Sequence, residues 1–304
     1  MEDTPRGSLP MYFPGGYDLA DVVNCATLVD VAYDQYTQWY NQDYPSRQNF
    51  VWTTPDNGYA YSAPLFWSYW WGIDYDEPFG FVASDSNLNA YLVFRGTMSD
   101  ADDAQDLKTD QTAYTIVPNY GQVHLGFFEI YQSLQADIYA AISGLNRLTP
   151  FKRFFFTGHS LGCGLSSLAV PDVITNTSVN PGQQIVLHHN FASPRVGDPQ
   201  FAYMMNNSGV PTFRIVNTED VIPDAPTSIL GSYVYKHIGT PIDFTAQYDT
   251  LGDNHSLDIA YEYAIAHPNN PEGPLPQRRL RLSRQPGVDV AVQGKLVRLR
   301  SRAA

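Results

Sequence analysis

The stretch Phe154-Phe155-Phe156-Thr157-Gly158-His159-Ser160-Leu161-Gly162 joins an apolar run to a Gly-X-Ser-X-Gly motif. The small residues that follow, from Cys163 to Val170, are compatible with a helix. A serine on a sharp turn between a strand and a helix has its hydroxyl exposed, an arrangement called a nucleophile elbow. The flanking glycines leave room for strand and helix to approach, because a Cβ there would clash. The stretch therefore predicts Ser160 as the nucleophile of a serine hydrolase.

The rest of the chain alternates between strand and helix patterns, which is typical of an α/β fold. The expected helices are Asp18–Tyr40, with Asp18 as its cap, Phe127–Ile142, a short helix from Asp198-Pro199, and Ser256–Ala266. The expected strands are Phe79–Ser84, Ala90–Phe94, 153–157, Gln184–Phe191, Pro211–Val216 and Tyr233–Ile238.

Composition divides the chain into three parts. Residues 1–17 are rich in Pro and Gly and are expected to form an N-terminal arm, followed by one α/β domain over 18–267. Prolines and then arginines over 268–304 indicate a linker and a basic tail, either disordered or an appended extension. A functional basic arm for an anionic surface is the alternative. Within the domain, the aromatic-rich segment Phe50–Tyr75 predicts a satellite core, and a substrate-contacting wall is the alternative.

Charge is distributed unevenly. Residues 1–277 contain 10 Lys and Arg against 30 Asp and Glu, whereas residues 278–304 contain 8 against 1. An acidic body of this kind argues against nucleic-acid binding. No apolar run reaches the 18 residues that indicate a membrane-spanning helix, and the N-terminus has no apolar signal segment. We expect no transmembrane segment, and export with the signal removed is favoured over a cytoplasmic location.

The two cysteines, Cys25 and Cys163, are too few for a disulfide framework. Cys163 lies three residues after Ser160, in the helix that should pack on the sheet. We expect it to be a small buried residue, and a bridge to Cys25 is the alternative.

A serine nucleophile needs a base and an orienting acid, which α/β-hydrolases supply in the order Ser, Asp or Glu, His. His255 lies between a turn and the last predicted helix, a position suited to reaching across a site, and His237 is the next candidate. Asp220 follows a predicted strand at its carboxyl end, where open α/β sheets place their sites. Its carboxylate would accept a hydrogen bond from the Nδ1–H of His255, and Asp224 is its nearest rival.

An oxyanion hole would complete this set. One donor is expected to be the backbone N–H of Leu161, the residue after the nucleophile. The second is expected from the turn Arg95-Gly96-Thr97, where Gly96 allows close backbone approach and Thr97 offers an N–H and a hydroxyl. Such donors are worth roughly 3–4 kcal/mol each in a transition state.

Six segments, in this order, resemble the class 3 lipases, a family of filamentous-fungal triacylglycerol lipases with bacterial and plant relatives. The segments are Leu92–Thr97, Val123–Phe127, Thr157–Gly162, Ala192–Asp198, Asn217–Pro223, and His255–Leu257 with Tyr261. The resemblance implies an α/β-hydrolase-type core in a single domain, with a mixed, mostly parallel sheet flanked by helices. It also implies ester hydrolysis without metal or cofactor. His124 and Arg195, in matching segments, are expected to be structural hydrogen-bonding residues near the site.

The function this resemblance favours is a triacylglycerol lipase that acts on a lipid or other ester at a transient lipid–water interface. A phospholipase A1 or a feruloyl or carboxyl esterase would use the same triad, and a non-catalytic binding module is the alternative from another class. The segment Met98–Gln111, where fungal members carry an amphipathic lid, contains five aspartates and no aromatic residue. We therefore expect only a modest gain in activity at an interface.

Overall fold

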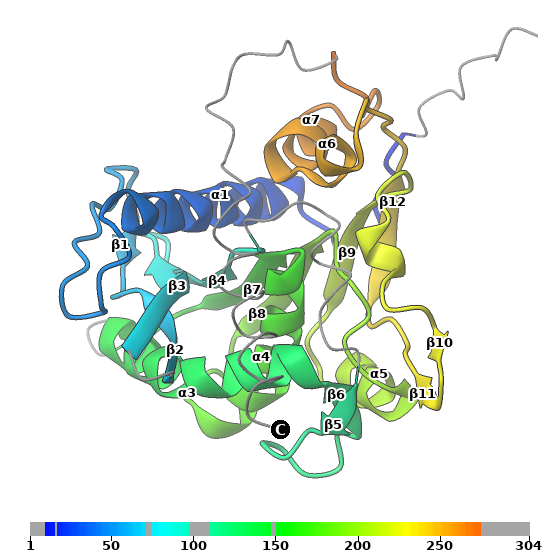
Figure 1. Ribbon diagram of the computed structural model, residues 1–304. Coiled ribbons are helices and arrows are strands. Elements are labelled where there is room, and N and C mark those ends of the chain that lie inside the picture. Colours follow the sequence, from blue (N-terminus) through cyan, green and yellow to red (C-terminus); the bar gives the residue numbers. More distant parts are fainter. Residues whose placement is uncertain (1–9, 16, 71–73, 98–109, 147–149, 275–304) are drawn as a thin grey trace, which may run out of the picture.

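The computed structural model describes residues 10–15, 17–70, 74–97, 110–146 and 150–274. Most of the segment Met98–Gln111 and the basic tail from residue 275 lie outside the described residues. The described parts form three layers, with a central sheet between two groups of helices (Figure 1). This is the α/β class that the alternating pattern predicts.

The central sheet has eight strands in the order β1-β3-β4-β7-β8-β9-β12, with β2 also paired to β3. Strands β4, β7, β8, β9 and β12 run parallel, whereas β1, β2 and β4 pair with β3 in antiparallel register. The sheet is therefore mixed and mostly parallel. The strands are β1 (Ala60–Tyr61), β2 (Leu65–Trp70), β3 (Asp74–Ser84), β4 (Asn89–Phe94), β7 (Arg153–His159), β8 (Ile185–Phe191), β9 (Thr212–Asn217) and β12 (Thr240–Phe244).

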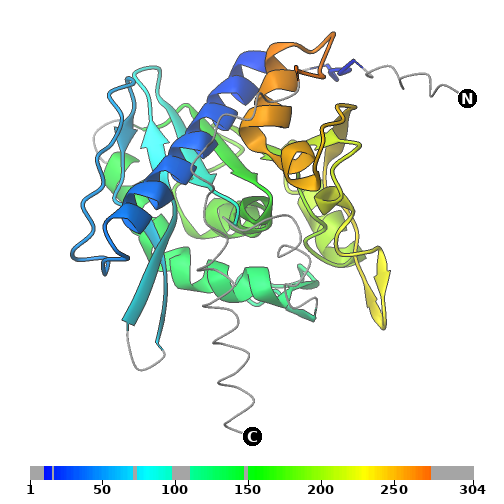
Figure 2. The same ribbon diagram turned by 45° about the horizontal axis from the view of Figure 1, so that its top comes forward.

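Two groups of helices cover the sheet (Figure 1, Figure 2). One face is covered by α1 (Leu19–Asn41), the π-helix Leu257–Tyr261 and α7 (Glu262–Ala266). The other is covered by α3 (Leu125–Asn146), α4 (Leu161–Asn176) and α5 (Pro199–Asn206). The predicted caps are confirmed: Asp18 accepts from the N–H of Ala20 (2.9 Å) and Asp198 from that of Phe201 (2.7 Å).

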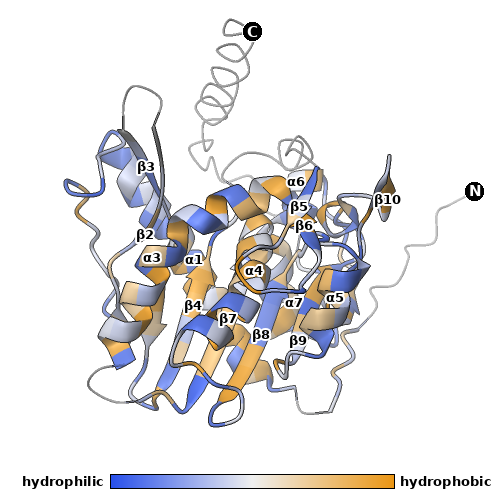
Figure 3. Cartoon of the chain, turned by 90° about the horizontal axis from the view of Figure 1, so that it is seen from below, coloured by the Kyte–Doolittle hydropathy of each residue, from blue (hydrophilic) through white to orange (hydrophobic). Residues whose placement is uncertain are grey.

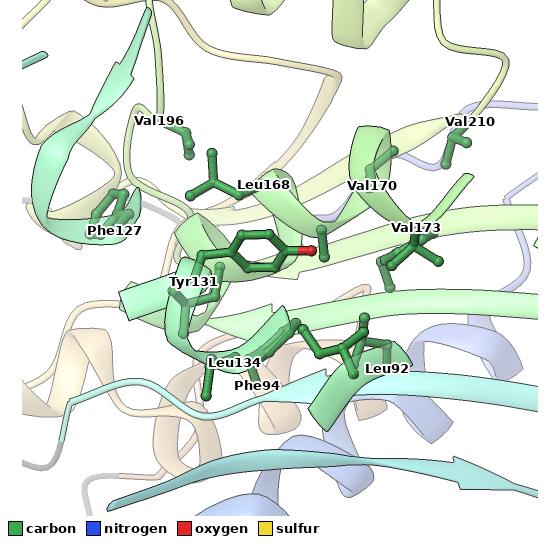
Figure 4. Packing of buried hydrophobic residues seen from close by; sticks show 14 of the residues in the cluster. Leu92, Phe94, Phe127, Tyr131, Leu134, Leu168, Val170, Val173, Val196 and Val210 are labelled. Atoms are coloured by element: carbon green, nitrogen blue, oxygen red, sulfur yellow. The ribbon is translucent and has the colours of Figure 1, made fainter. Parts of the chain in front are cut away.

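Strand β7 shows how the sequence divides between the two faces. Phe155 packs beneath α1, whereas Phe154 and Phe156 pack on the side of α3 and α4, because successive strand side chains alternate. All three are fully buried, and burial of each stabilises the fold by about 1.5–3 kcal/mol. Figure 4 shows this second side, where Tyr131 of α3 and Leu168 of α4 belong to one cluster.

Strand β8 carries polar residues through the middle of the sheet, and this hydrophilic stretch is visible in Figure 3. His188 faces α4 and makes hydrogen bonds with Ser166 Oγ (2.9 Å) and Thr212 Oγ1 (3.2 Å). His189 faces α1, and among the described residues neither ring nitrogen has a hydrogen-bond partner. Burial lowers the pKa of both imidazoles to about 3. Both rings are therefore neutral in the folded protein at ordinary pH.

The predicted strand Tyr233–Ile238 is confirmed only in part. Tyr233–Val234 (β11) pairs with Ile229–Leu230 (β10), Lys236 makes one isolated bridge with Gly197, and none of these residues joins the central sheet. The place beside β9 is taken by β12, which the sequence pattern did not indicate because Pro241 and Asp243 are poor strand residues. Proline is tolerated there because β12 is an edge strand. The remaining short elements are β5 (Gln111–Ala113), β6 (Gln122–His124), the 3-10 turn Ile222–Asp224 and α6 (Leu251–His255).

The prediction for Cys163 is confirmed, whereas the aromatic segment packs against the main core and does not form a separate satellite core. Cys25 and Cys163 are both free and buried, so the alternative of a bridge is wrong. The Cys163 thiol donates to the carbonyl oxygens of Gly158 and Phe191, both at 3.0 Å. Trp52 of the aromatic segment packs at the edge of the core beneath α1.

The described end of the N-terminal arm lies against residues that follow α7. Met11 is buried, and its N–H donates to the carbonyl oxygen of Pro268 (2.9 Å). Gly273 N–H donates to the hydroxyl of Tyr248 (3.0 Å). Of the helices in the described ranges, none has the length and apolarity needed to cross a membrane.

Candidate active site

Ser160 lies on the sharp turn between β7 and α4, with φ +56° and ψ −124°. A positive φ is strained for a residue with a Cβ and costs on the order of 1–3 kcal/mol. The flanking glycines make the turn possible. A Cβ at Gly158 would lie 2.4 Å from the backbone of Gly162, and one at Gly162 would lie 2.5 Å from the oxygen of Phe94. The strand–turn–helix unit predicted around Ser160 is therefore present.

The Ser160 side chain is buried, with 1% of the residue exposed. Its Oγ has no hydrogen-bond partner among the described residues. Hydrogen bonds of a catalytic serine are often long in a free enzyme and tighten when substrate binds. The backbone conformation of the turn therefore places the Ser160 side chain, without a hydrogen bond to a described side chain.

His255 and Asp220, 35 residues apart in sequence, are joined by a hydrogen bond of 2.8 Å between Nδ1 and Oδ2. A carboxylate oxygen only accepts, so Nδ1 carries the proton and Nε2 is left with its lone pair. The Asp220 side chain is fully buried. It also accepts from the hydroxyl of Tyr261 (2.7 Å) and from the N–H of Ile222 (2.9 Å). The pair is thus an imidazole oriented by a buried carboxylate that is saturated with donors.

Side-chain amides hold the loop that carries His255. Asn254, just before it, donates to the carbonyl oxygen of Glu219 (3.1 Å) and accepts from the N–H of Tyr248 (2.7 Å). Asn217, at the end of β9, donates to the carbonyl oxygen of Asn254 (3.0 Å). These bonds connect the Asp220 loop directly to the His255 loop, and they fix the place of one loop relative to the other.

The expected oxyanion donors lie on both sides of the turn. Leu161 is the buried first residue of α4, and Thr97 is partly buried in the segment after β4. This segment approaches the turn closely, since a Cβ at Gly96 would lie 2.9 Å from the Cβ of Ser160. Arg95 anchors the segment after β4. Its guanidinium donates to the carbonyl oxygens of Pro78 (2.9 Å) and Gly96 (2.7 Å) and forms an ion pair with Glu77. The structure therefore brings Ser160, Leu161 and Thr97 to one place.

The rival candidates do not form such a set. Asp224 has an 85% exposed side chain and is 3.4 Å from Arg195. His237 lies in the loop after β11, where burial and then Arg214 lower its pKa to about 3.

His124 and Arg195 make the structural hydrogen bonds expected of them. His124 Nδ1 accepts from the N–H of Phe127 (3.4 Å) in the first turn of α3. Arg195 donates to the carbonyl oxygens of Asp224 and Pro226 in the loop after Asp220. Within the described ranges, no three His, Cys, Asp or Glu side chains are arranged to hold a metal ion.

Sequence reasoning missed two residues beside the turn, His159 and Tyr33. His159 Nδ1 lies 2.7 Å from the Tyr33 hydroxyl, and its Nε2 lies 2.8 Å from the carbonyl oxygen of His255. Burial, and secondly the His255 imidazole, hold the pKa of His159 well below its usual range. The variable position of the Gly-X-Ser-X-Gly motif was the only sequence signal for His159, and Tyr33 had none, because it lies on α1.

Residues 91–229 match the sequence profile of a family described as lipase (class 3). A lipase from Rhizomucor miehei is 30% identical over 162 residues, which is 53% of this chain and 44% of that protein. A phospholipase A1-II 3 from Oryza sativa subsp. japonica is 28% identical over 217 residues, which is 62% of this chain and 49% of that protein. The matches thus span less than half the length of these curated relatives.

A solved structure shows the same fold. It is that of a triacylglycerol lipase whose catalytic centre is described as a serine protease triad. It superposes with a TM-score of 0.59 at 21% identity, covering 78% of this chain and 83% of that one. The sheet order and flanking helices are therefore those of the fungal lipase form of the α/β-hydrolase fold.

Proposed function

Because the chain belongs to the class 3 lipase family, we propose that it hydrolyses carboxylic esters with Ser160 as nucleophile, His255 as base and Asp220 as orienting acid. The observation that carries the proposal is the 2.8 Å hydrogen bond from His255 Nδ1 to the buried Asp220. It sets the tautomer in which Nε2 can take a proton. The strained turn at Ser160, beside Thr97 and Leu161, supports the same assignment.

The proposed reaction runs in two halves. Ser160 Oγ attacks the ester carbonyl carbon while His255 Nε2 takes its proton, and Thr97 and the Leu161 N–H stabilise the oxyanion. Collapse breaks the bond to the alcohol, which leaves with the proton from His255, and an acyl-Ser160 ester remains. Water then attacks the acyl carbon while His255 takes its proton. Collapse breaks the bond to Ser160 Oγ, which takes the proton back from His255, and the carboxylic acid is released.

The test of the nucleophile is Ser160→Ala, with the exposed Ser143→Ala on α3 as matched control. We expect kcat on a soluble ester to fall on the order of 10⁴-fold or more in Ser160→Ala, because only binding and the oxyanion hole remain. A fluorophosphonate should label the wild type and Ser143→Ala but not Ser160→Ala. Wild-type hydrolysis by Ser160→Ala would overturn the proposal.

Triacylglycerols are the substrate class we favour, on the likeness to the Rhizomucor miehei lipase. The matched part of this chain is longer for the rice phospholipase A1, which makes phospholipid the second candidate. Rates on a chain-length series of p-nitrophenyl esters and triglycerides, on phosphatidylcholine labelled in the sn-1 acyl chain, and on a feruloyl ester separate these classes. Release of the sn-1 chain faster than hydrolysis of every triglyceride would assign the chain to phospholipids.

A further inference from the structure

Three hydrogen bonds connect the loop of His255 to the segment that carries Thr97. His159 Nε2 is 2.8 Å from the carbonyl oxygen of His255, and since a carbonyl only accepts, Nε2 carries the proton. His159 Nδ1 is then unprotonated and accepts from the Tyr33 hydroxyl at 2.7 Å. The oxygen of Tyr33 in turn accepts from the N–H of Gly96 at 3.0 Å. The carbonyl of His255 and the N–H of Gly96 therefore fix which atom donates and which accepts in each of the three hydrogen bonds.

The bonds join parts of the sequence that are far apart. Tyr33 on α1 is 63 residues from Gly96 and 126 from His159, and His159 is 96 from His255. Ser160 is the next residue after His159, so the nucleophile lies at the middle of the connection. The fit around Gly96 is tight, because a Cβ there would lie 2.5 Å from the Tyr33 oxygen. A small displacement of any one of these groups is therefore passed to the others.

We propose that Tyr33 and His159 are positioning residues that hold the His255 loop and the Gly96–Thr97 segment at fixed places on either side of Ser160. The proposal rests on the proposed function, since it gives these two side chains a role in the same reaction. Neither touches the substrate carbonyl; they act through His255 and through the backbone of Gly96. Misplacement of reacting groups by about 1 Å lowers rates by up to 10²-fold, which sets the size of the effect.

The connection requires a neutral His159. The groups that face its ring are the Tyr33 hydroxyl, the His255 imidazole with a centroid distance of 4.7 Å, and the Tyr261 ring at 5.9 Å. No carboxylate among the described residues makes a hydrogen bond to it. A proton on Nδ1 would remove the acceptor for Tyr33 and place a cation beside the base. Burial of the ring keeps it in the neutral form that the connection needs.

Two substitutions of His159 separate its two bonds. In His159→Gln the amide Nε2 lies near the imidazole Nε2 and can still donate to the His255 carbonyl, whereas the bond to Tyr33 is lost. In His159→Asn the amide Oδ1 lies near the imidazole Nδ1 and can still accept from Tyr33, whereas the bond to His255 is lost. Tyr33→Phe removes both bonds of the hydroxyl. Tyr131→Phe is the matched control, because it also deletes a buried tyrosine hydroxyl, one bonded to Asp172 at 2.6 Å.

We expect Tyr33→Phe to lower kcat on a soluble ester by about 10- to 100-fold, with KM within about twofold, because orientation matters most in the transition state. His159→Gln and His159→Asn should each lower kcat by about 5- to 50-fold. The double variant Tyr33→Phe/His159→Gln should match Tyr33→Phe alone within about twofold, because both changes break the same bond. Tyr33→Phe/His159→Asn should lose the product of the two single effects.

Each outcome decides the proposal. It is overturned if the variants keep wild-type kcat while Ser160→Ala is inactive, or if they lose kcat only in proportion to folded protein, as counted by fluorophosphonate labelling. It is also overturned if the two double variants behave alike. Activity in Ser160→Ala would instead remove the proposed function on which the connection rests. If Tyr33→Phe does not fold, the two His159 variants carry the test by themselves.

Discussion

Asp220 and Asp172 are both fully buried carboxylates surrounded by hydrogen-bond donors, but their partners differ in kind. Asp220 accepts from a tyrosine hydroxyl, a backbone N–H and the imidazole of His255. Asp172 lies on α4 twelve residues after Ser160, about 18 Å along the helix. Its four donors are uncharged: the hydroxyls of Tyr131 and Tyr139 and the side-chain amides of Gln135 and Asn176.

The difference lies in whether a partner can change its charge. The pKa of Tyr139 is raised to about 12, first by burial and then by Asp172, so its phenol stays protonated in any working buffer. The Asp172 cluster therefore links α3 to α4 in one fixed state. An imidazole can take up and release a proton during a reaction, and an adjacent carboxylate stabilises the imidazolium that forms. Under the proposed function, Asp220 takes part in the reaction and Asp172 only in stability, so burial alone does not distinguish the two roles.

The largest effect is expected from Asp220→Asn. The amide cannot stabilise a charged His255 and favours the wrong tautomer, so kcat should fall on the order of 10⁴-fold. The side-chain volume is unchanged, but one amide oxygen cannot accept from all three donors around Asp220, so the melting temperature should fall by a few degrees. Kinetics on a soluble ester and a thermal melt of the same sample measure both. A loss of activity below tenfold would place Asp220 with Asp172 as a structural residue.

His189 extends the comparison to a buried polar group without described hydrogen-bond partners. Its ring stacks between Phe155 and Phe213, and burial, then Arg153, lowers its pKa from 6.5 to about 3. A depressed imidazole pKa gives stability that is present above pH 6.5 and is lost as the pH falls toward 3, because only the unfolded chain takes up the proton. At pH 4 the loss is roughly 3 kcal/mol.

His189→Phe should therefore flatten the fall in unfolding free energy between pH 6.5 and 4, as followed by denaturant titration. His188→Phe is the contrast, because that ring is bonded to Ser166 and Thr212 and its removal should destabilise the fold at neutral pH too. An unchanged acid slope in His189→Phe would mean that this imidazole is protonated in the folded state.

Asp172→Asn should lower stability about as much as Asp220→Asn but should leave kcat almost unchanged. One amide oxygen cannot accept from four donors, so the free energy of unfolding should fall by about 1–3 kcal/mol, a few degrees in melting temperature. We expect kcat within about twofold of wild type. The same two measurements apply, and a loss of kcat larger than tenfold in folded protein would show that the α3–α4 link reaches the site.

The sequence predicted those features of the fold and the site that depend on residues close together in the chain. The turn at Ser160, the caps Asp18 and Asp198 and five of the eight strands in the central sheet were found, because each depends on neighbouring residues. Strand β12 was missed, because Pro241 and Asp243 hide its pattern and only its edge position makes them tolerable.

Contacts between distant segments left no such signal. His255 and Asp220 could be proposed from their places after a turn and a strand, and the structure adds the hydrogen bond between them. The contact of Tyr261 with Asp220 depends on a π-helix over Leu257–Tyr261, whose wider turn no periodicity indicated. In the sequence, Tyr33 fits the helical spacing of apolar residues in α1. The residues around it give no sign of its hydrogen bond to His159, 126 residues away.

The smallest effect is expected at Glu262, a partly buried carboxylate whose surroundings are opposite to those of Asp220. Burial, and then the charges of Asp30 and Asp258, raise its pKa from 4.5 to about 7. A raised carboxyl pKa gives stability that is complete below pH 4.5 and is lost as the pH rises through 7, because the folded protein holds the proton longer. Solvent reaches this side chain, so screening keeps the effect below about 1 kcal/mol.

Glu262→Gln should therefore raise the melting temperature slightly at pH 8.5 and leave it unchanged at pH 4, whereas the exposed Glu129→Gln should change neither. A melting temperature that falls at pH 8.5 would show that the ionised carboxylate has a stabilising partner.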